Sequence, residues 1–413
     1  MDNPVYAYTP PRVILPPRFF PWPWMMALLT VFQLLSASPL LLGGDAPLQL
    51  TLPLLLYPVA EWLFLLCLRH IGKQRRLELE VLGLWLSGIG LVISGSIQAD
   101  YAWRQAAAIG CGMLLYAVML WVLADPDRAM KLRPVVAAAG IALLVVNLAL
   151  AGFTNGARNW IFIGGISIQP SELVKLAFIF VGGATLDRLQ RTQSITRYLI
   201  FAIACVAVLF LIRDFGTALI FFAVFLLIAF LRSGDLRTIA LVSVAAVMGA
   251  GLVLVFRPYV ADRFRGYRHV WENINESGYQ QTRVLIYASS GGVFGLGLGN
   301  GKLRNVFAAS TDLVFGMLCE EWGLLLAFLV PCCYLAMAIF TLRAARQAQS
   351  AFYAIIAVSA AGLLLFQASL NIFGITDLLP LTGVTLPFIS RGGTSLLAAW
   401  GLLAFMKCVR RGA

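Results

Sequence analysis

The sequence predicts a polytopic all-α membrane protein with about twelve transmembrane helices. Of its 413 residues, 60% are hydrophobic and only 12% are charged, about half the charged fraction that is usual in soluble proteins. A soluble domain could not bury this much apolar surface, and a disordered chain needs low hydrophobicity and high charge. The apolar residues form long runs rather than the short alternating segments of a β-barrel. Helices, which satisfy their own backbone hydrogen bonds, are therefore expected to cross the membrane.

Each expected transmembrane helix is a mostly apolar run of the length that spans a bilayer, about 17–25 residues. The division between the seventh and the eighth helix falls at Arg213-Asp214, where a charge pair interrupts the apolar sequence. The twelve helices are expected at residues 24–44, 48–68, 80–97, 105–124, 134–152, 171–186, 197–212, 214–231, 238–256, 312–341, 351–374 and 386–406.

The distribution of basic residues orients these helices. Lys and Arg concentrate in cytoplasmic loops, and an N-terminus in the cytoplasm places 19 of the 31 basic residues in inner segments. The short outer loops then hold almost none, namely Arg104, Arg158 and Arg213. An even number of helices returns the basic C-terminal tail to the cytoplasm. The net charge of +12 is therefore expected to reflect membrane topology rather than nucleic-acid binding.

The cysteines and histidines indicate neither disulfides nor a metal centre. The seven cysteines form no CxxC pair and nearly all lie in apolar runs, so they are interpreted as small hydrophobic residues. The two histidines, His70 and His269, are far apart in the sequence, which argues against a histidine metal site. The proline-containing N-terminal tail shows no cleavage pattern of a signal peptide.

The segment 257–311 is expected to form one large loop outside the membrane. Loops of this length are usually functional or disordered, and the aromatic and polar residues here favour a folded loop. The glycine run at 291–302 does not match a phosphate-binding loop, because no glycine stands five residues before Gly301-Lys302 and Leu303 follows the lysine. We expect a tightly turning, re-entrant segment instead.

Charged residues also occur where outer loops enter the membrane. Pro170 and Glu172 suit the first turn of a helix, so this segment is either a helix start or part of a site. Lys175 falls within the apolar run, on the same side as Glu172 by its i,i+3 spacing, and a charge inside the membrane is functional by default. The pair Arg213-Asp214 is either a local ion pair or part of the same site.

Three carboxylates lie near the start of the tenth expected helix, at Asp312, Glu320 and Glu321. Asp312 and Glu320 are eight residues apart, close to two helical turns, and are expected to share one face. Because lipid exposure would be costly, this face is expected to line a polar cavity. Asn371 and the Pro and Gly residues at 379–395 indicate irregular backbone at membrane depth, which is tolerated only beside protein or water.

Five longer motifs, spread over about four-fifths of the chain, contain these residues. They are GARNWIFIGGISIQPSELVK (156–175), RDFGTALI (213–220), GYQQTRVLIYASSGGVFGLGLGNG (278–301), TDLVFGMLCEEWG (311–323) and LLPLTGVTLPFISRGGTS (378–395). Together and in this order they resemble the SEDS family (shape, elongation, division and sporulation; FtsW/RodA/SpoVE type). The resemblance implies a ten-helix core at 80–413, preceded by a tail and two additional helices at 1–79.

This resemblance implies a peptidoglycan glycosyltransferase that polymerises lipid II on the outer face of the bacterial cytoplasmic membrane. The implied partners are membrane lipid and a class B penicillin-binding protein, the transpeptidase, but no nucleic acid. The acceptor hydroxyl needs a base. The leaving pyrophosphate needs cations, from Arg or Lys or from a divalent cation such as Mg²⁺, for which no ligands are assigned. The residues implied to bind substrate or pyrophosphate are Arg158, Lys175, Arg213, Asp312, Glu321, Ser390, Thr394 and Ser395.

The chain departs from the family pattern at two functionally important positions. Counting back from Gly-Tyr-Gln at 278–280 places the family's presumed catalytic aspartate on Asn273. An amide cannot accept a proton as a carboxylate does. In addition, the usual Ser-Tyr-Gly-Gly appears as Ser390-Arg391-Gly392-Gly393.

Three interpretations of the function remain open. The chain is a polymerase with a shifted catalytic base, for which Glu272 and Glu276 are the candidates and Asp262 is a poorer one. Alternatively, it has lost catalysis and serves as a scaffold or regulator, or it acts on another lipid-linked sugar. A flippase for the lipid-linked precursor is the third, but the two related halves with paired broken helices that a transporter should show are not evident. The sequence does not distinguish division, elongation and sporulation.

Overall fold

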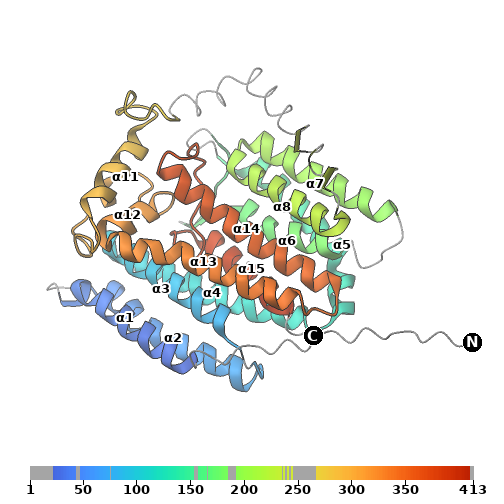
Figure 1. Cartoon of the computed structure of the whole chain (residues 1–413), viewed down its shortest axis with the longest axis horizontal. Coiled ribbons are helices and arrows are strands. Elements are labelled where there is room, and N and C mark those ends of the chain that lie inside the picture. Colours follow the sequence, from blue (N-terminus) through green and yellow to red (C-terminus); the bar gives the residue numbers. More distant parts are fainter. Residues whose placement is uncertain are drawn as a thin grey trace, which may run out of the picture.

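The computed structural model describes residues 22–42, 47–74, 76–152, 157–164, 166–184, 192–234 and 267–409, and a few residues between 236 and 244. Within these ranges the chain is almost entirely helical, and most of the helices lie side by side in one bundle (Figure 1). The helices of the first half are α1 (Trp22–Leu42), α2 (Leu48–His70), α3 (Glu78–Ile97), α4 (Ala99–Val122), α5 (Pro126–Leu150), α6 (Pro170–Ala184), α7 (Thr192–Ile212) and α8 (Phe215–Ser233). The second half contains α11 (Tyr279–Ser290), the short 3₁₀ helix η1 (Leu303–Asn305), α12 (Val314–Glu321), α13 (Gly323–Ala345), α14 (Ala351–Ile375) and α15 (Gly393–Cys408).

The length and composition of these helices confirm a multi-pass helical membrane protein. In the described part of the chain, eight helices are long and apolar enough to cross a bilayer, namely α1 to α5, α8, α13 and α14. Two shorter apolar helices accompany them, at Tyr198–Ile212 within α7 and at Gly393–Cys408. The expected ninth span, 238–256, lies almost entirely outside the described residues.

The expected single span 312–341 is wrong, because the structure divides it into α12 and α13. The break follows Trp322, and Gly323 adopts a left-handed φ of +83°. A Cβ at this position would lie 2.3 Å from the carbonyl oxygen of Val293 and 2.4 Å from the backbone nitrogen of Gly295. Glycine is thus needed here for both its conformation and its size, since the glycine-rich segment packs directly against the break.

Other features near the candidate site also differ from the expectation. The last helix begins at Gly393 rather than at residue 386, and the segment before it is irregular, as its Pro and Gly residues predict. A short antiparallel hairpin of β1 (Ile161–Ile163) and β2 (Ile166–Ile168), which the sequence analysis did not predict, precedes α6. Gly164, with a φ of +56°, lies in its turn.

The two additional N-terminal helices lie along one side of the bundle, next to α3 and α4 (Figure 1). Their buried contacts with the core are polar as well as apolar, since the Tyr57 hydroxyl donates to the Leu84 carbonyl at 2.7 Å. Gln33 and Glu61, both buried, are hydrogen-bonded to each other at 2.8 Å. The division of the chain at residues 79 and 80 stays a prediction.

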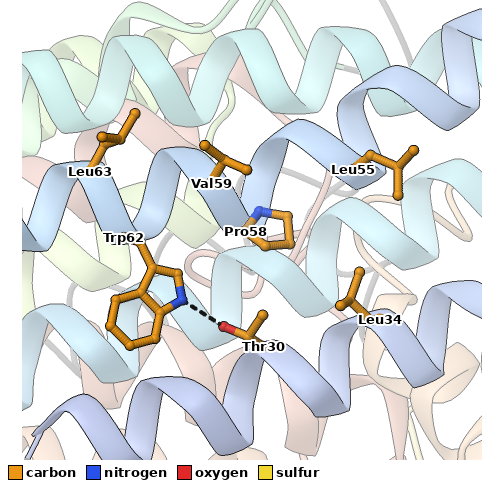
Figure 2. Close-up of a pocket in the computed structure, with 7 residues that line it drawn as sticks. All are labelled: Thr30, Leu34, Leu55, Pro58, Val59, Trp62 and Leu63. Atoms are coloured by element: carbon orange, nitrogen blue, oxygen red, sulfur yellow. Dashed lines mark hydrogen bonds between the residues drawn. The ribbon is translucent and has the colours of Figure 1, made fainter.

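Figure 2 shows an apolar groove between α1 and α2, with a volume of about 420 Å³. The Trp62 indole on α2 donates a hydrogen bond of 3.0 Å to the Thr30 hydroxyl on α1, which closes one end of the contact between the two helices. Leu34, Leu55 and Val59 contribute apolar lining. Such a lining suits contact with lipid chains, so the groove needs no polar ligand.

The centre of the bundle is formed by α3, α14 and α15, whose residues are mostly buried. Even charged residues are enclosed there: Lys407 near the end of α15 forms a 2.5 Å ion pair with Glu80 of α3, and neither side chain is more than 4% exposed. The Tyr116 hydroxyl of α4 donates to the same Glu80 carboxylate at 2.5 Å. This triad joins α3, α4 and α15 at one end of the bundle.

Candidate functional site

The irregular segment between α14 and α15, residues 376–392 (the α14–α15 linker), lies at the centre of the candidate site. Much of it is buried, so its backbone groups need partners inside the protein. Side chains of neighbouring helices provide them: the Gln367 amide donates to the Thr385 carbonyl at 2.9 Å, and the Asn371 amide donates to the Val384 carbonyl at 2.7 Å. The backbone of the linker is thus held by polar residues of α14.

Glu172 and Lys175 of α6 are connected to one of these α14 side chains. Their side chains form the ion pair that the i,i+3 spacing predicts, at 2.7 Å, and they are only 5% and 1% exposed. The Lys175 ammonium also donates to the Gln367 side-chain oxygen at 2.9 Å. The buried charge of Lys175 is therefore connected through Gln367 to Thr385 in the linker.

Asp214 begins α8 as its N-cap residue. One carboxylate oxygen accepts from the Thr217 backbone N–H at 3.0 Å, and the other accepts from the Gln169 amide at 3.2 Å and the Ser171 hydroxyl at 3.4 Å. Asp214 is thus paired with polar groups of the α6 entrance rather than with Arg213 alone. The capping and the cross-helix contacts together fix the starts of α6 and α8 relative to each other.

Three predicted site residues near α15 connect this network to the linker. The Thr394 hydroxyl accepts from the Gln169 backbone N–H at 3.2 Å. The Ser395 hydroxyl lies 2.6 Å from the Thr385 hydroxyl. The Ser390 hydroxyl donates to the Thr311 carbonyl at 2.5 Å and accepts from the backbone N–H of Leu386. These hydroxyls order the protein's own backbone at the site.

Asp312 lies just before α12, next to Thr311 in the same turn. Its backbone carbonyl accepts from the Asn371 amide at 2.8 Å, and one carboxylate oxygen lies 3.4 Å from the place where a Cβ on Gly383 would stand. Burial raises the pKa of Asp312 to about 7, against a smaller opposite effect of its hydrogen bond with Thr311. A carboxyl with a pKa near neutrality suits proton transfer at physiological pH.

The expectation that Asp312 and Glu320 share a helix face is wrong, because α12 begins only at Val314. Glu320 instead accepts the backbone N–H groups of Lys302 at 2.6 Å and Leu303 at 2.9 Å. The Glu320 carboxylate therefore holds the end of the glycine-rich run in place. Its role in the described structure is to order that loop.

Glu321, the neighbouring residue, is also buried and lies near α3. The Ser96 hydroxyl is 3.5 Å from one of its carboxylate oxygens, and burial raises the pKa of Glu321 to about 7, assisted by the charge of Glu320. The Gly297 backbone N–H donates to the Glu321 carbonyl at 3.0 Å. The glycine run is thus the tightly turning segment that the sequence predicts, with four of its glycines at positive φ.

The predicted base candidates of the large loop lie on the surface. Glu272 contacts the His269 ring at 3.1 Å, and its side chain is 74% exposed. The Asn273 amide donates to the His269 carbonyl at 3.2 Å, and Glu276 is exposed. The part of the loop before residue 267, including Asp262, lies outside the described residues.

This surface segment is nevertheless attached to the α14–α15 linker. The Tyr267 hydroxyl donates to the Leu378 carbonyl at 3.0 Å, and the Arg268 backbone N–H donates to the Asp377 carboxylate at 3.2 Å. The large loop and the linker therefore meet. Within the described part of the chain, no hydrogen bond or ion pair joins Glu272, Asn273 or Glu276 to Lys175 or Asp312.

Two predicted cations lie near the start of α8. Arg158 is exposed, and its backbone N–H donates to the Ile212 carbonyl at 3.0 Å. Arg213, next to Ile212, is half-buried and has a φ of +68°. These residues place positive charge at the same end of the bundle as the Asp214 network.

Some residues of the network were missed by the sequence analysis. Gln367 and Thr385 form its connection to the linker, and a polar Gln within the apolar run of α14 is the signal that could have identified one of them. In the described part of the chain, no three His, Cys, Asp or Glu side chains are grouped so as to hold a metal ion. The carboxylates of Asp214 and Glu172 are already occupied by protein donors, so these residues do not fit a Mg²⁺ site.

The comparison with protein families covers most of this chain. Residues 84–412 match the FtsW/RodA/SpoVE family, described as cell cycle proteins. The chain belongs to this family. The match begins inside α3, so α1 and α2 precede it, and it includes every residue of the network described above.

Relatives with known names agree with this family. The chain is 29% identical over 349 residues to stage V sporulation protein E of Bacillus subtilis, covering 79% of this chain and 95% of the relative. It is 28% identical to the peptidoglycan glycosyltransferase RodA of Mycobacterium leprae, covering 73% of this chain and 68% of the relative. It is 34% identical to the probable peptidoglycan glycosyltransferase FtsW of Francisella salina, covering 59% and 63%.

Solved structures show the same fold. A chain of a structure described as "Structural coordination of polymerization and crosslinking by a peptidoglycan synthase complex" superposes with a TM-score of 0.67 at 25% identity, covering 81% of this chain and 96% of that chain. The rod shape determining protein RodA of Thermus thermophilus superposes with a TM-score of 0.61 at 25% identity, with the same coverage. The predicted family resemblance and fold class are confirmed.

Proposed function

We propose that this protein is a peptidoglycan glycosyltransferase that polymerises lipid II into glycan strands on the outer face of the bacterial cytoplasmic membrane. Its membership of the FtsW/RodA/SpoVE family supports this function. So do the names of relatives that are peptidoglycan glycosyltransferases. The positive-inside distribution of its basic residues supports cytoplasmic N- and C-termini.

The observation that carries the proposal is the buried polar network around the α14–α15 linker. Buried charges and hydrogen-bonding side chains are expensive in a membrane protein and mark functional sites. Here the buried Lys175 ammonium is connected to the linker through Gln367, and the backbone carbonyl of the half-buried Asp312 is connected to the same linker through Asn371. A glycosyl transfer needs a base and cationic charge held in one place.

Asp312 is the catalytic base of this proposal. An acceptor sugar hydroxyl gives its proton to the Asp312 carboxylate while its oxygen forms the new bond to the anomeric carbon of the donor. The bond from that carbon to the pyrophosphate breaks, and undecaprenyl pyrophosphate leaves with the electron pair. Arg158 and Arg213 stabilise the negative charge that develops on it. The pKa of about 7 at Asp312 supports this role, whereas Glu272 and Glu276 are exposed to solvent.

A catalytically inactive scaffold is the second candidate function. The specific observation in its favour is Asn273 at the position of the family's presumed catalytic aspartate, with its amide turned to the His269 carbonyl. In that case the buried network would have a structural role only, and the protein would organise a partner that performs the chemistry.

A class B penicillin-binding protein is the proposed partner in either case. The similarity to a chain of a peptidoglycan synthase complex supports this partner class. Polymerisation and cross-linking would then be performed by two proteins of one membrane complex.

Polymerisation of lipid II by the purified protein with its transpeptidase partner tests the proposal. We expect glycan strands from the unmodified chain, and a loss of about 100-fold or more in Asp312→Asn, as for removal of a general base. Glu272→Gln and Glu276→Gln are the matched acid-to-amide controls and should retain activity. The absence of polymer from the unmodified protein would favour the scaffold, and a full loss in Glu272→Gln would move the base to the large loop.

A further inference from the structure

Arg391 is an unusual residue at the junction of the α14–α15 linker and α15. The sequence has Ser390-Arg391-Gly392-Gly393 where the family pattern has tyrosine in the second position. The substitution brings a permanent positive charge to the end of the bundle that contains Asp312. The proposed reaction assigns no role to it so far.

The Arg391 side chain is held on two sides. Its guanidinium carbon lies 3.8 Å from the centre of the Tyr101 ring of α4, in a cation–π contact. Its Nε donates to the Ser310 hydroxyl at 3.0 Å, and its backbone N–H donates to the Ser310 carbonyl at 2.8 Å. The orientation of the guanidinium plane is therefore fixed before any ligand arrives, which reduces the entropy cost of binding.

The two terminal amino groups of Arg391 are left for another partner. Within the part of the chain that the structure describes, only Nε of this side chain has a hydrogen-bond acceptor. The side chain is half-buried rather than enclosed. A guanidinium fixed through Nε and presenting its remaining donors matches the bidentate geometry that recognises phosphate oxygens.

Among the described residues, the charged groups around Arg391 do not cancel its own positive charge. Arg104 and Asp100, which form an ion pair of 2.7 Å on α4, both act electrostatically on Arg391. Two arginines and one aspartate leave one net positive charge. An arginine stays protonated at neutral pH even where burial lowers its pKa, so this charge is available to an anion.

The start of α15 adds a second feature that attracts anions. Its N-cap is Gly392, and no side chain caps the helix. Gly393 has open space on its side-chain face, since a Cβ there would meet no atom within 4 Å. Free backbone N–H groups and the positive end of the helix dipole favour a phosphate at such a position. Arg391 directly precedes this first turn in the sequence, so both features lie at the same end of α15.

We infer that Arg391 and the first turn of α15 bind the pyrophosphate of a lipid-linked substrate. The choice of a polyprenyl pyrophosphate as the ligand rests on the proposed function, whereas the recognition of phosphate rests on the geometry of this site. The Ser310–Asp312 turn connects the site to the proposed base, because Arg391 contacts Ser310 at one end of the turn and Asp312 occupies the other. The pyrophosphate is thereby placed beside the segment that carries the proposed base.

Direct binding of undecaprenyl pyrophosphate to the full-length protein tests this inference without turnover. The protein is placed in nanodiscs of zwitterionic lipid, and binding is titrated by native mass spectrometry. Arg391→Gln is expected to weaken binding about 10- to 100-fold, as for the loss of charge-assisted hydrogen bonds. Arg391→Lys keeps the positive charge but loses the bidentate donor geometry of the guanidinium, and is expected to weaken binding by about 3- to 10-fold.

The matched control is Arg128→Gln. Arg128 also lies over an aromatic ring, at 4.1 Å from the centre of Trp121 near the opposite end of α4. Its replacement removes the same charge and the same kind of contact, and binding should not change. The thermal unfolding midpoint of each variant shows whether it is folded, and Arg391→Lys provides the test if Arg391→Gln is not.

Two competitors distinguish the source of the phosphate. Undecaprenol, which has no phosphate, should not displace the ligand, and phosphatidylglycerol should displace it poorly. Equal competition by phosphatidylglycerol would overturn the assignment to a pyrophosphate. Unchanged binding in Arg391→Gln and Arg391→Lys would overturn the site itself, even if the unmodified protein makes polymer. Binding that depends on Arg391 in a protein that makes no polymer would support the site and refute the proposed catalytic function.

Discussion

Replacing Lys175 with methionine tests whether the buried network holds the α14–α15 linker in place. Lys175 is 1% exposed and donates to Glu172 at 2.7 Å and to Gln367 at 2.9 Å. Methionine fills a similar volume but leaves the Glu172 carboxylate buried without a cation. It also frees the Gln367 side chain, which donates to the carbonyl of Thr385. The change therefore affects both the ion pair and the linker.

The magnitude follows from the environment of the pair. Removing one partner of a buried ion pair costs about 3–5 kcal/mol, because the remaining charge is uncompensated. Glu172→Gln in the same protein removes that charge, so the double variant should recover most of the loss. The coupling free energy between the two positions is expected to be about 2 kcal/mol or more. Reversible unfolding of the unmodified protein, the two single variants and the double variant in mixed micelles measures this coupling free energy.

Lys131→Met provides the control for the loss of a lysine. Lys131 is exposed on α5, and a surface substitution of this kind should change the free energy of unfolding by less than about 0.5 kcal/mol. A cost below 1 kcal/mol for Lys175→Met, or additive effects of the two network substitutions, would refute the reasoning. Either result would mean that water solvates the Glu172–Lys175 ion pair in the membrane-embedded protein.

Three further predictions concern single residues. Because a base must be deprotonated, the polymerisation rate should fall as the pH drops through about 7, the pKa of Asp312. The same raised pKa means that the folded state favours the protonated form. The contribution of Asp312 to stability should therefore be complete below its ordinary pKa of 3.8 and be lost as the pH rises towards 7, and pH-dependent unfolding of Asp312→Asn should lack this loss. Gly323→Ala should destabilise the protein by about 1–2 kcal/mol or more, because φ is +83° and the new methyl group would meet backbone atoms; Gly110→Ala, where no atom lies within 4 Å, should be neutral or slightly stabilising by the same unfolding assay. Tyr116→Phe removes the 2.5 Å hydrogen bond to Glu80 and should cost about 1–3 kcal/mol, whereas unchanged stability would show that the Lys407 ammonium alone satisfies the buried carboxylate.

The fold class could be predicted from composition and the length of the apolar runs, because both directly reflect the membrane. The ends of the helices could be predicted less well from the sequence. Nothing local in the sequence shows that α12 stops at Glu321 and that Gly323 must adopt a positive φ, since the cause is the glycine-rich segment packed against it from about 30 residues earlier. The late start of α15 at Gly393 is likewise fixed by contacts of the linker with Gln105 of α4, with the turn before α12, and with Gln367 and Asn371 of α14.

The candidate site was predictable in part, and the reason differs between residues. Glu172 and Lys175 were found because a fixed helical spacing and an intramembrane charge are both visible in the sequence. Gln367 and Thr385 were not, since their importance depends on the contact of Gln367 with Lys175, about 190 residues away in the chain, and on the contact of Gln367 with Thr385. The relation of Asn273 to a catalytic position came from the family pattern alone, and in the structure its amide donates to the His269 carbonyl.

Lys407 shows how one residue can satisfy two interpretations. Its place near the C-terminus contributed to the prediction of a cytoplasmic tail, yet the structure buries it against Glu80. At the other end of the same helix, Thr394 and Ser395 are bonded to Gln169 and Thr385. Helix α15 has 16 residues and is therefore about 24 Å long. It is thus held by polar contacts at both ends, and the triad around Glu80 sets the axial position of the helix that carries the first turn beside Arg391. A substitution that releases Lys407 should for this reason shift the first turn of α15 at the candidate site, although no atom of the triad lies in that site.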